Sequence, residues 1–268
     1  MTKFALIGKN IEDSLSPSIY KVFFEYYNKK SDYLCISCSK KNFFYYIKKF
    51  FLNDGFGMNI TSPFKNISYS ICDFHTERSI KCRSVNVIKK INGFLIGDNT
   101  DGIGLLQDLV KIGFLKKNYK ILILGSGGVI KSIVLSLMSF KSIKIFLHAR
   151  NARKIKEIQN FFGNRNIQIA DTCKKNQIYN LIIQATSIVS YREIQNLTKF
   201  VKISKNTLFY DLNYSNKKTT YSSYYKKKVK KYTNGIGMLF YQAAHAFFFW
   251  NGIFPNIEIL KKILYKHK

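Results

Sequence analysis

The segment 120–132, KILILGSGGVIKS, constrains the fold of this chain more than any other feature. Residues 121–124 form a short, continuous apolar run of the kind that a fully buried parallel strand presents. Four residues, Gly125-Ser126-Gly127-Gly128, follow directly, and a helix pattern comes after them. Glycines let the backbone approach a ligand closely, and the N–H groups at a helix N-terminus favour a phosphate. The segment therefore predicts an α/β fold with a dinucleotide site. The alternative is a tight turn without a ligand, because Ile130 replaces the third glycine of G-x-G-x-x-G.

Basic residues follow the next predicted strand, 143–147. Arg150 stands at its tip, Arg153 and Lys154 lie just beyond, and no carboxylate is present there. An acid about 20 residues after the glycines binds the ribose hydroxyls of NAD, whereas Arg accommodates the 2′-phosphate of NADP. The pattern therefore favours NADP. The alternative is that these cations are one more solvated patch on a basic protein.

The net charge of +29 raises the question of a nucleic-acid partner. Only six of the 44 basic residues are Arg, and the lysines are spread through nearly every segment. Arg carries most base recognition and bidentate phosphate recognition, so a dispersed Lys excess indicates composition rather than a specific site. Any binding to nucleic acid is expected to be independent of sequence and to fall steeply with salt.

The five cysteines are an odd number, and no secretory signal precedes them. We therefore expect thiols in a reducing cytoplasm. Cys35 and Cys38 have the C-x-x-C spacing, but residues three apart on a strand face opposite sides and no second pair is present, so no metal site is predicted. The longest apolar run is interrupted by Gln242 and His245 and is too short to span a membrane, so we expect a soluble protein that contacts no membrane.

Strand and helix patterns alternate over the first hundred residues and predict a small α/β domain. Strands are expected at 3–8, 33–38 and 56–60, and helices at 17–28 and 42–52. The length of 268 residues and the hydrophobic content of 46% suit one large domain or two ordinary ones.

Polar residues follow two of these strands, at the end of a strand where open α/β sheets bind ligands. Ser16 is a good N-cap with Pro17 at the first helical position, and this leaves Ser14 unexplained. Lys65 comes just after the third strand in the same way. These positions predict a site at one edge of the first sheet.

A hairpin is predicted over 84–97 with a turn at Asn92-Gly93. It leads into Asp98-Asn99-Thr100-Asp101-Gly102, followed by a helix pattern over 103–112. Two aspartates so close together stand out among only fifteen acids. Asp101 is either a simple N-cap or a functional carboxylate, and the pattern alone leaves both open.

Seven motifs together resemble the shikimate dehydrogenase family in their order, over almost the whole chain. They are Ser14-x-Ser16-Pro17, Asn59-Ile60-Thr61-x-Pro63-Phe64-Lys65, Val85-Asn86, Gly97-Asp98-Asn99-Thr100-Asp101-Gly102, Gly125-x-Gly127-Gly128, Ala185-Thr186-Ser187 and Gly235-x-Gly237-Met238-Leu239-x-x-Gln242-Ala243-Ala244. The resemblance implies two α/β domains. Residues 1–100 with 238–268 would form a substrate-binding catalytic domain to which the C-terminal helices return, and residues 101–237 a Rossmann-like NADP-binding domain.

The resemblance also implies an activity: the reversible reduction of 3-dehydroshikimate to shikimate by NADPH, in the shikimate pathway to chorismate and aromatic amino acids. Two alternatives stay open. One is a quinate or shikimate dehydrogenase that prefers NAD, and the other is a homologue that kept the fold, lost activity and binds polyanions. The complete polar set at the substrate site argues against the second. A monomer and a homodimer are both compatible with the sequence.

Site residues carry over from the resemblance position by position, with Lys65 and Asp101 at the reacting centre. The partners of the substrate carboxylate would be Ser14, Ser16 and Tyr214, and those of its ring hydroxyls Thr61, Asn86 and Gln242. The cofactor pyrophosphate would be held by Gly125, Ser126, Gly127, Gly128 and Val129, the 2′-phosphate by Arg150 and Lys154, and the nicotinamide end by Thr186, Gly235 and Met238.

Several positions depart from the family pattern. Val87 stands where Thr commonly follows the Asn, and Gln184 replaces Asn before Ala-Thr-Ser. Ala149 and Asn151 flank the expected phosphate-binding Arg where Asn and Thr are usual, which leaves the strength of NADP selection open. His245, three positions after the expected substrate ligand on the last helix, is predicted to be a partly buried structural histidine rather than a catalytic one.

Overall fold

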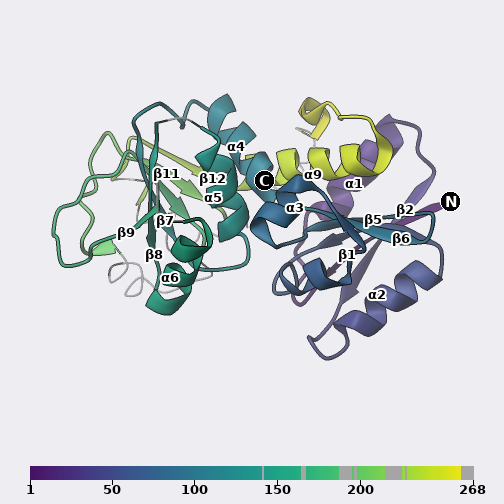
Figure 1. Cartoon of the computed structure of the whole chain (residues 1–268). Coiled ribbons are helices and arrows are strands. Elements are labelled where there is room, and N and C mark those ends of the chain that lie inside the picture. The colour runs from purple at the N-terminus through teal and green to yellow at the C-terminus, as the bar shows by residue number, and fades with distance from the viewer. Residues whose placement is uncertain are drawn as a thin grey trace. The chain divides into compact units, whose positions relative to one another are not determined.

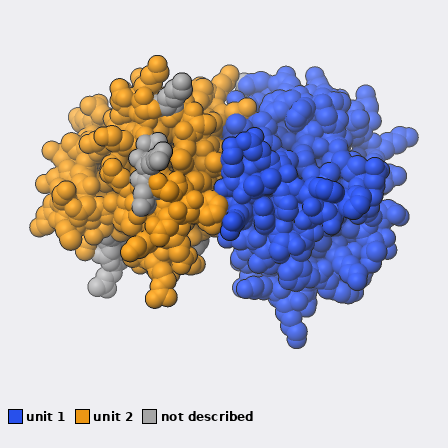
Figure 2. Space-filling view, viewed as in Figure 1, with its two compact units in different colours: residues 1–104, 239–268 blue, residues 105–238 orange. Residues whose placement is uncertain are grey.

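The computed structural model describes residues 1–140, 142–163, 167–186, 195, 198–214, 225–226 and 228–260. The chain divides into two compact units (Figure 1, Figure 2). The first unit comprises Met1–Gly104 with Leu239–Lys268, and the second comprises Leu105–Met238. Residues 261–268 of the expected substrate domain, and Ser187 of the Ala-Thr-Ser motif, lie outside the described residues.

The first unit contains a mixed six-stranded sheet in the order β2-β1-β3-β5-β6-β4. Strand β1 pairs in parallel with β2 and β3, while β5 runs antiparallel to both β3 and β6. The carboxyl ends of β1, β3 and β6 and the start of β5 therefore lie at the same edge of the sheet. The strands are β1 Thr2–Gly8, β2 Ser31–Ser37, β3 Gly55–Ile60, β4 Phe74–His75, β5 Val87–Ile91 and β6 Phe94–Asp98.

Helices cover both faces of this sheet (Figure 1). Alternate residues of β1 point to opposite faces, so Ala5 packs with α2 while Phe4 contacts Phe24 of α1 and Trp250 of α9 at ring distances of 4.9 and 4.7 Å. The indole nitrogen of Trp250 donates to the carbonyl of Ile88 at 2.9 Å, which ties α9 to the sheet. The helices are α1 Ser16–Tyr26, α2 Phe43–Leu52, α3 Glu77–Cys82 and α9 Ile236–Asn251, with 3₁₀ turns η1 Ile67–Ile71 and η2 Ile257–Leu260.

The second unit is a parallel six-stranded sheet in the order β12-β11-β10-β7-β8-β9. Its central strands are buried on both faces, as a parallel sheet covered on both sides requires. Ile121 and Ile123 pack with α4, α5 and α6, whereas Leu122 and Leu124 pack with Tyr179 on the other face. The strands are β7 Lys120–Leu124, β8 Lys144–His148, β9 Ile167–Ile169, β10 Leu181–Gln184, β11 Leu208–Asp211 and β12 Lys231–Asn234, and the helices α4 Asp101–Lys111, α5 Ile130–Met138 and α6 Ala152–Phe161.

The predicted α/β class, strand and helix pattern are confirmed, including the hairpin turn, where Asn92 and Gly93 both have positive φ. One local prediction is wrong. Helix α1 begins at Ser16, with Leu15 as the N-cap residue and no side-chain cap. The backbone N–H of Ser16 donates to the hydroxyl of Ser14 at 3.2 Å. The helix therefore starts one residue earlier than predicted, and Ser14, not Ser16, supplies the accepting hydroxyl.

The helices of the described part of the chain are all too short, or too polar, to cross a membrane.

Candidate active site

Most of the predicted substrate-side residues of the first unit lie in loops or at helix starts at one edge of its sheet. Ser14 and Ser16 follow β1, Thr61 and Lys65 follow β3, Asn86 precedes β5, and Asp101 follows β6. The loops after β1 and β3 are in close contact, because a Cβ on Gly8 would lie 2.3 Å from the methyl group of Thr61. The order of the strands thus brings together residues that are up to 87 positions apart in sequence (101 − 14).

The core of this site is the ion pair between Lys65 and Asp101. Lys65 Nζ donates to Asp101 Oδ2 at 2.7 Å, and the two side chains are only 14% and 6% exposed. The backbone N–H of Val85 donates to the Lys65 carbonyl at 2.9 Å, which fixes the loop that carries the lysine. An ammonium has three N–H donors, so Lys65 bound to one carboxylate keeps the capacity to donate to a substrate oxygen.

Asn86 holds the other oxygen of the same carboxylate. Its Nδ2 donates to Asp101 Oδ1 at 3.1 Å and to Thr100 Oγ1 at 3.0 Å, while its Oδ1 accepts from the Thr100 N–H at 2.8 Å. Asp101 is the first residue of α4, and its backbone N–H donates to Asn99 Oδ1 at 3.2 Å. Asn99 therefore caps the helix start, and both Asp101 oxygens are engaged by Lys65 and Asn86. These contacts favour the functional carboxylate over the simple N-cap.

Gln242 reaches the same network from α9. Its Oε1 accepts from Asn86 Nδ2 at 3.5 Å, and its Nε2 donates to the Leu239 carbonyl at 3.0 Å. A Cβ on Gly104 would lie 2.7 Å from the Gln242 backbone nitrogen, so α4 and α9 cross in close contact here. The structure thus joins Lys65, Asn86, Asp101 and Gln242 by hydrogen bonds. Ser14, Ser16 and Thr61 share the sheet edge, and Tyr214 belongs to the second unit.

The predicted phosphate loop follows β7 in the second unit. Gly125 has φ +136°, and a Cβ there would lie 2.8 Å from the Ala185 carbonyl oxygen, so only glycine fits. A Cβ on Gly127 would meet nothing within 4 Å, which leaves room for a ligand beside this backbone. Val129 occupies the N-cap of α5 without a side-chain cap. Because β7 lies between β8 and β10, the loop is also at the switch point of the sheet, where α/β folds bind dinucleotides. These features fit a pyrophosphate.

The basic residues expected at the 2′-phosphate lie next to this loop in the sheet, after β8. Arg150 and Lys154 are both exposed. Asn151, which stands where Thr is usual, is the N-cap of α6, and its side chain accepts from the Lys154 N–H at 3.1 Å. Burial lowers the pKa of His148, so this ring at the end of β8 is uncharged at neutral pH. The positive charge at this strand end therefore comes from Arg150, Arg153 and Lys154.

Thr186, expected near the nicotinamide, is oriented by the unusual Gln184. The Gln184 side chain is fully buried, and its Nε2 donates to Thr186 Oγ1 at 2.6 Å. Its Oε1 is buried without a hydrogen-bond partner. The longer amide at position 184 thus still serves to hold the threonine in place.

Sequence reasoning missed a buried acid that supports the start of α9. Asp108 Oδ2 accepts from the Tyr210 hydroxyl at 2.6 Å, and that hydroxyl accepts from the Met238 N–H at 3.2 Å. Burial raises the pKa of Asp108, which the hydrogen bond from Tyr210 partly offsets. A Cβ on Gly237 would collide with the Asp108 carboxylate. The available signal was the position of Asp108 beside Leu105 and Leu109, on the apolar face of its helix.

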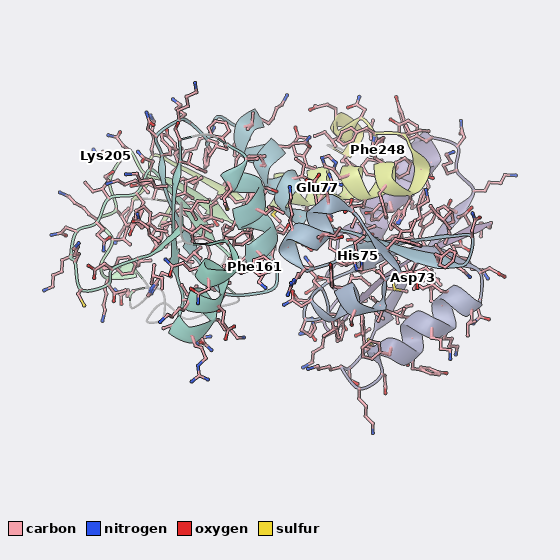
Figure 3. The ribbon with its side chains drawn as sticks, viewed as in Figure 1. Asp73, His75, Glu77, Phe161, Lys205 and Phe248 are labelled. Atoms are coloured by element: carbon pink, nitrogen blue, oxygen red, sulfur yellow. The ribbon has the colours of Figure 1, made fainter. Side chains whose placement is uncertain are left out.

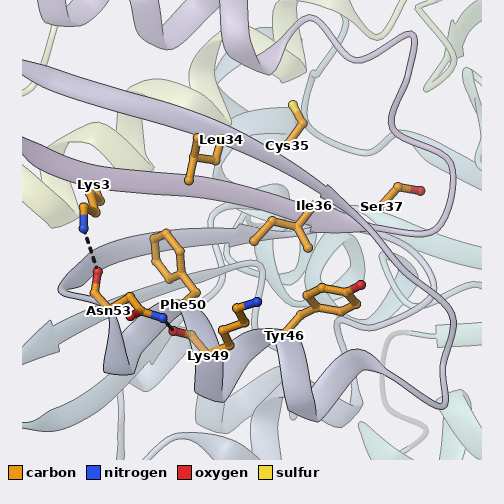
Figure 4. A pocket seen from close by; sticks show the side chains of 9 residues that line it. All are labelled: Lys3, Leu34, Cys35, Ile36, Ser37, Tyr46, Lys49, Phe50 and Asn53. Carbon is orange, nitrogen blue, oxygen red and sulfur yellow. Dashed lines mark hydrogen bonds between the residues drawn. The ribbon is translucent and has the colours of Figure 1, made fainter.

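A groove of about 470 Å³ between β2 and α2 lies elsewhere on the first unit (Figure 4). Its walls include Leu34 and Ile36 of β2 and Tyr46, Lys49 and Phe50 of α2. None of the predicted site residues lines it, so it is separate from the site built around Lys65.

Two family models match the chain. The model described as the shikimate dehydrogenase substrate binding domain matches residues 6–88, and the model described as the shikimate 5′-dehydrogenase C-terminal domain matches residues 235–265.

Several proteins named shikimate dehydrogenase (NADP(+)) are similar to the chain over nearly its whole length. The protein from Buchnera aphidicola subsp. Cinara cedri is 40% identical over 268 residues, covering 97% of this chain and 95% of that protein. The protein from Buchnera aphidicola subsp. Acyrthosiphon pisum (strain Tuc7) is 38% identical over 267 residues, covering 98% and 97%. The protein from Blochmanniella floridana is 35% identical over 285 residues, covering 97% of each.

Solved structures agree in fold. The shikimate dehydrogenase of Aquifex aeolicus superimposes with a TM-score of 0.87 at 25% identity, covering 98% of this chain and 97% of that one. A shikimate dehydrogenase in complex with NADP⁺ gives a TM-score of 0.84 at 29% identity, covering 100% and 96%.

Proposed function

The chain belongs to the shikimate dehydrogenase family, and on that premise we propose that it catalyses the reversible reduction of 3-dehydroshikimate to shikimate by NADPH. This reaction would serve the pathway to chorismate and aromatic amino acids. The observation that carries the proposal is the largely buried pair of Lys65 and Asp101, with side chains 14% and 6% exposed, 2.7 Å apart and held by Asn86. The glycine loop after β7 supports a dinucleotide cofactor in the second unit.

Lys65 donates the proton that the reduction requires. NADPH, when bound, supplies the hydride that reduces the substrate carbonyl carbon. Negative charge then develops on the carbonyl oxygen, and the Lys65 ammonium stabilises it and donates the proton. Arg would not serve, because it does not release its proton near neutral pH. Asp101 orients the ammonium through its Oδ2, which accepts from Lys65 Nζ at 2.7 Å.

The remaining residues of the first unit bind and orient the substrate. Ser14, Ser16 and Tyr214 would bind the carboxylate, and Thr61, Asn86 and Gln242 would bind the ring hydroxyls. The contact from Asn86 to Gln242 is the longest in the network at 3.5 Å. We expect it to be the contact that a substrate hydroxyl replaces, since the other Asn86 contacts, at 2.8–3.1 Å, hold the loop.

The cofactor would lie along the carboxyl ends of the second sheet. Gly125, Ser126, Gly127, Gly128 and Val129 would hold the pyrophosphate, Arg150 and Lys154 the 2′-phosphate, and Thr186, Gly235 and Met238 the nicotinamide end. Exposed cations at the tip of β8 support NADP over NAD. We therefore divide the chain into a substrate domain of residues 1–100 with 238–268 and an NADP domain of residues 101–237.

We also place the enzyme in the cytoplasm, as a monomer or homodimer without a specific nucleic-acid partner. The free thiols of all five cysteines support a reducing compartment.

An oxidation assay tests the proposal. The purified protein is supplied with shikimate or quinate, each with NADP⁺ or NAD⁺, and the appearance of reduced nicotinamide is followed. We expect turnover with shikimate and a higher kcat/KM with NADP⁺ than with NAD⁺. Turnover with NAD⁺ and quinate alone would show a different specificity, and no turnover in any combination would contradict the proposed reaction.

A further inference from the structure

A second buried carboxylate, Asp98, lies three residues before Asp101 and has no role in the chemistry described above. Its side chain is fully buried at the end of β6. Arg78, next to Glu77 at the start of α3 (Figure 3), donates from Nε to Asp98 Oδ1 at 3.2 Å and from Nη2 to Oδ2. The hydroxyl of Thr76, the N-cap residue of α3, donates to the same carboxylate. Buried charges require partners of this kind, and the pair joins α3 to the end of β6.

This carboxylate also holds the loop that leads to Asp101. Asp98 Oδ1 accepts from the Asn99 N–H at 2.6 Å. Asn99 in turn accepts from the Asp101 N–H at 3.2 Å and donates from Nδ2 to the Ser84 carbonyl at 3.1 Å. The Asn86 N–H donates to the Asp98 carbonyl at 3.0 Å. Each step from Arg78 to Asp101 is thus a hydrogen bond between described residues.

We propose that Arg78 and Asp98 are positioning residues, whose ion pair holds the loop 98–101 so that Asp101 keeps the Lys65 ammonium aligned for proton transfer. This inference rests on the proposed function for its chemistry, and on the contacts of residues 76–101 for its geometry. A displacement of about 1 Å at a reacting group can lower a rate by about 10²-fold, so a loop clamp of this kind has a direct effect on turnover.

Two other titratable groups near Asp98, His245 and Cys82, are uncharged at neutral pH. His245 lies on α9, three residues after Gln242, and burial and the nearby Arg78 lower its pKa to about 4, against an opposing effect of Asp98. Cys82 lies close to both aspartates, and its pKa is raised to about 12, chiefly by burial. His245 therefore does not compete as a cation for Asp98, and Cys82 adds no anion. The charge on Asp98 is balanced by Arg78.

Helix α3 offers a matched control. Lys81 and Glu77 form an exposed ion pair, with side chains 55% and 79% exposed. Lys81→Met removes a cation from the same helix without touching Asp98. Arg78→Met removes the cation, itself 40% exposed, that pairs with the fully buried Asp98, and Arg78→Lys keeps the charge but loses the two-pronged geometry. Melting temperatures are measured to check that each variant is folded at the assay temperature. If Arg78→Met does not fold, Arg78→Lys alone tests whether the ion pair positions the loop 98–101.

The first measurement does not depend on activity. Amide hydrogen exchange of the segment 98–104 is compared in all variants. We expect faster exchange there in Arg78→Met and Arg78→Lys, and wild-type exchange in Lys81→Met. Unchanged exchange of this segment in both Arg78 variants would overturn the inference, whether or not the wild-type protein oxidises shikimate.

The second measurement separates positioning from general stability. With shikimate and NADP⁺, Arg78→Met should lower kcat by about 10- to 100-fold, with KM changed by less than about 3-fold. In an Asp101→Asn background Arg78→Met should lower kcat by less than about 2-fold, because the Asp101 carboxylate that Arg78 positions is already absent. A loss of kcat as large in that background as in the wild type would overturn the inference. An inactive wild-type protein would instead contradict the proposed function, and the exchange result would stand alone.

Discussion

At the scale of single residues, the expected cofactor site contains charged side chains whose binding partners cannot be read from the sequence. Arg150 stands exposed at the tip of β8, where the 2′-phosphate of NADP is expected. The flanking Asn151 caps α6 through its Oδ1, which accepts from the Lys154 N–H, and its Nδ2 keeps two N–H donors. We expect the selection of NADP to rest chiefly on the two cations Arg150 and Lys154.

Arg150→Glu tests that dependence. The substitution should weaken NADP⁺ binding by at least about 1.5–3 kcal/mol, the range of a charge-assisted hydrogen bond, and should change NAD⁺ binding much less. Isothermal titration with each cofactor measures the two effects, and Lys205→Glu, on an exposed side chain of the same unit (Figure 3), controls for net charge. Equal losses for both cofactors would show that Arg150 does not meet the phosphate.

His245 makes stability depend on pH. Its pKa is lowered from an ordinary 6.5 to about 4, first by burial and then by Arg78. The unfolded chain therefore takes up a proton below pH 6.5 that the folded chain does not accept until about pH 4. The contribution of the neutral ring to stability is complete above pH 6.5 and is lost as the pH falls towards 4. The full shift corresponds to about 3 kcal/mol, and water around the partly exposed ring reduces this to about 1–2 kcal/mol.

His245→Gln should remove this part of the pH dependence. Urea unfolding of the variant and the wild type is compared at intervals between pH 7 and pH 4, and the difference between the two curves isolates the histidine from the carboxylates that titrate in both. The difference should change by about 1–2 kcal/mol across that window. Parallel curves would show that the ring is not desolvated as described.

At the scale of secondary-structure elements, sequence patterns predicted the architecture well. The hydrophobic runs placed β1, β2, β3, β5 and β6 of the first sheet and β7 and β8 of the second, because a half-buried or fully buried strand carries its own hydrophobic signature. No prediction was made for β4 or for β9 to β12. The start of α1 was placed wrongly, since a Ser-Pro pair reads as cap and first turn while the helix actually includes Ser16. The hydrogen bonds by which Asp108 and Tyr210 hold the start of α9 were not predicted, because the two residues are 102 positions apart in sequence.

The turn between β7 and α5 supports a prediction with a built-in control. Gly125→Ala should lower stability by about 1–3 kcal/mol, because it has a positive φ and its Cβ would press on Ala185. Gly127→Ala should leave stability within about 0.5 kcal/mol, because its Cβ meets open space. Gly127→Ala should still weaken NADP⁺ binding if the pyrophosphate lies close to the Gly127 backbone. Unchanged Kd for NADP⁺ in a folded Gly127→Ala variant would place the pyrophosphate elsewhere.

At the scale of the whole molecule, topology decides what a pattern cannot. Each motif predicted a residue at the end of a strand, but only the strand order β2-β1-β3-β5-β6-β4 shows that the loops after β1, β3 and β6 share an edge. The pairing of Lys65 with Asp101 was expected from the family resemblance and not from spacing. The sequence analysis gave Arg78 no role. It is one of only six arginines among 44 basic residues, and an Arg in a lysine-rich chain was the available signal for a two-pronged contact with a carboxylate.

We propose above all that Lys65, oriented by Asp101, donates the proton that accompanies hydride transfer to the substrate. The measurement that tests it most directly is steady-state kinetics of shikimate oxidation by the wild type, Lys65→Met and Asp101→Asn, with substrate varied at saturating NADP⁺. We predict that Lys65→Met lowers kcat by about 10²- to 10⁴-fold while KM for shikimate changes far less, because we expect Ser14 and Ser16 to hold the carboxylate in the variant as well. Asp101→Asn, which keeps the size but not the charge, should also lower kcat. Near-normal kcat in Lys65→Met, with only KM raised, would contradict the account and make Lys65 a binding residue.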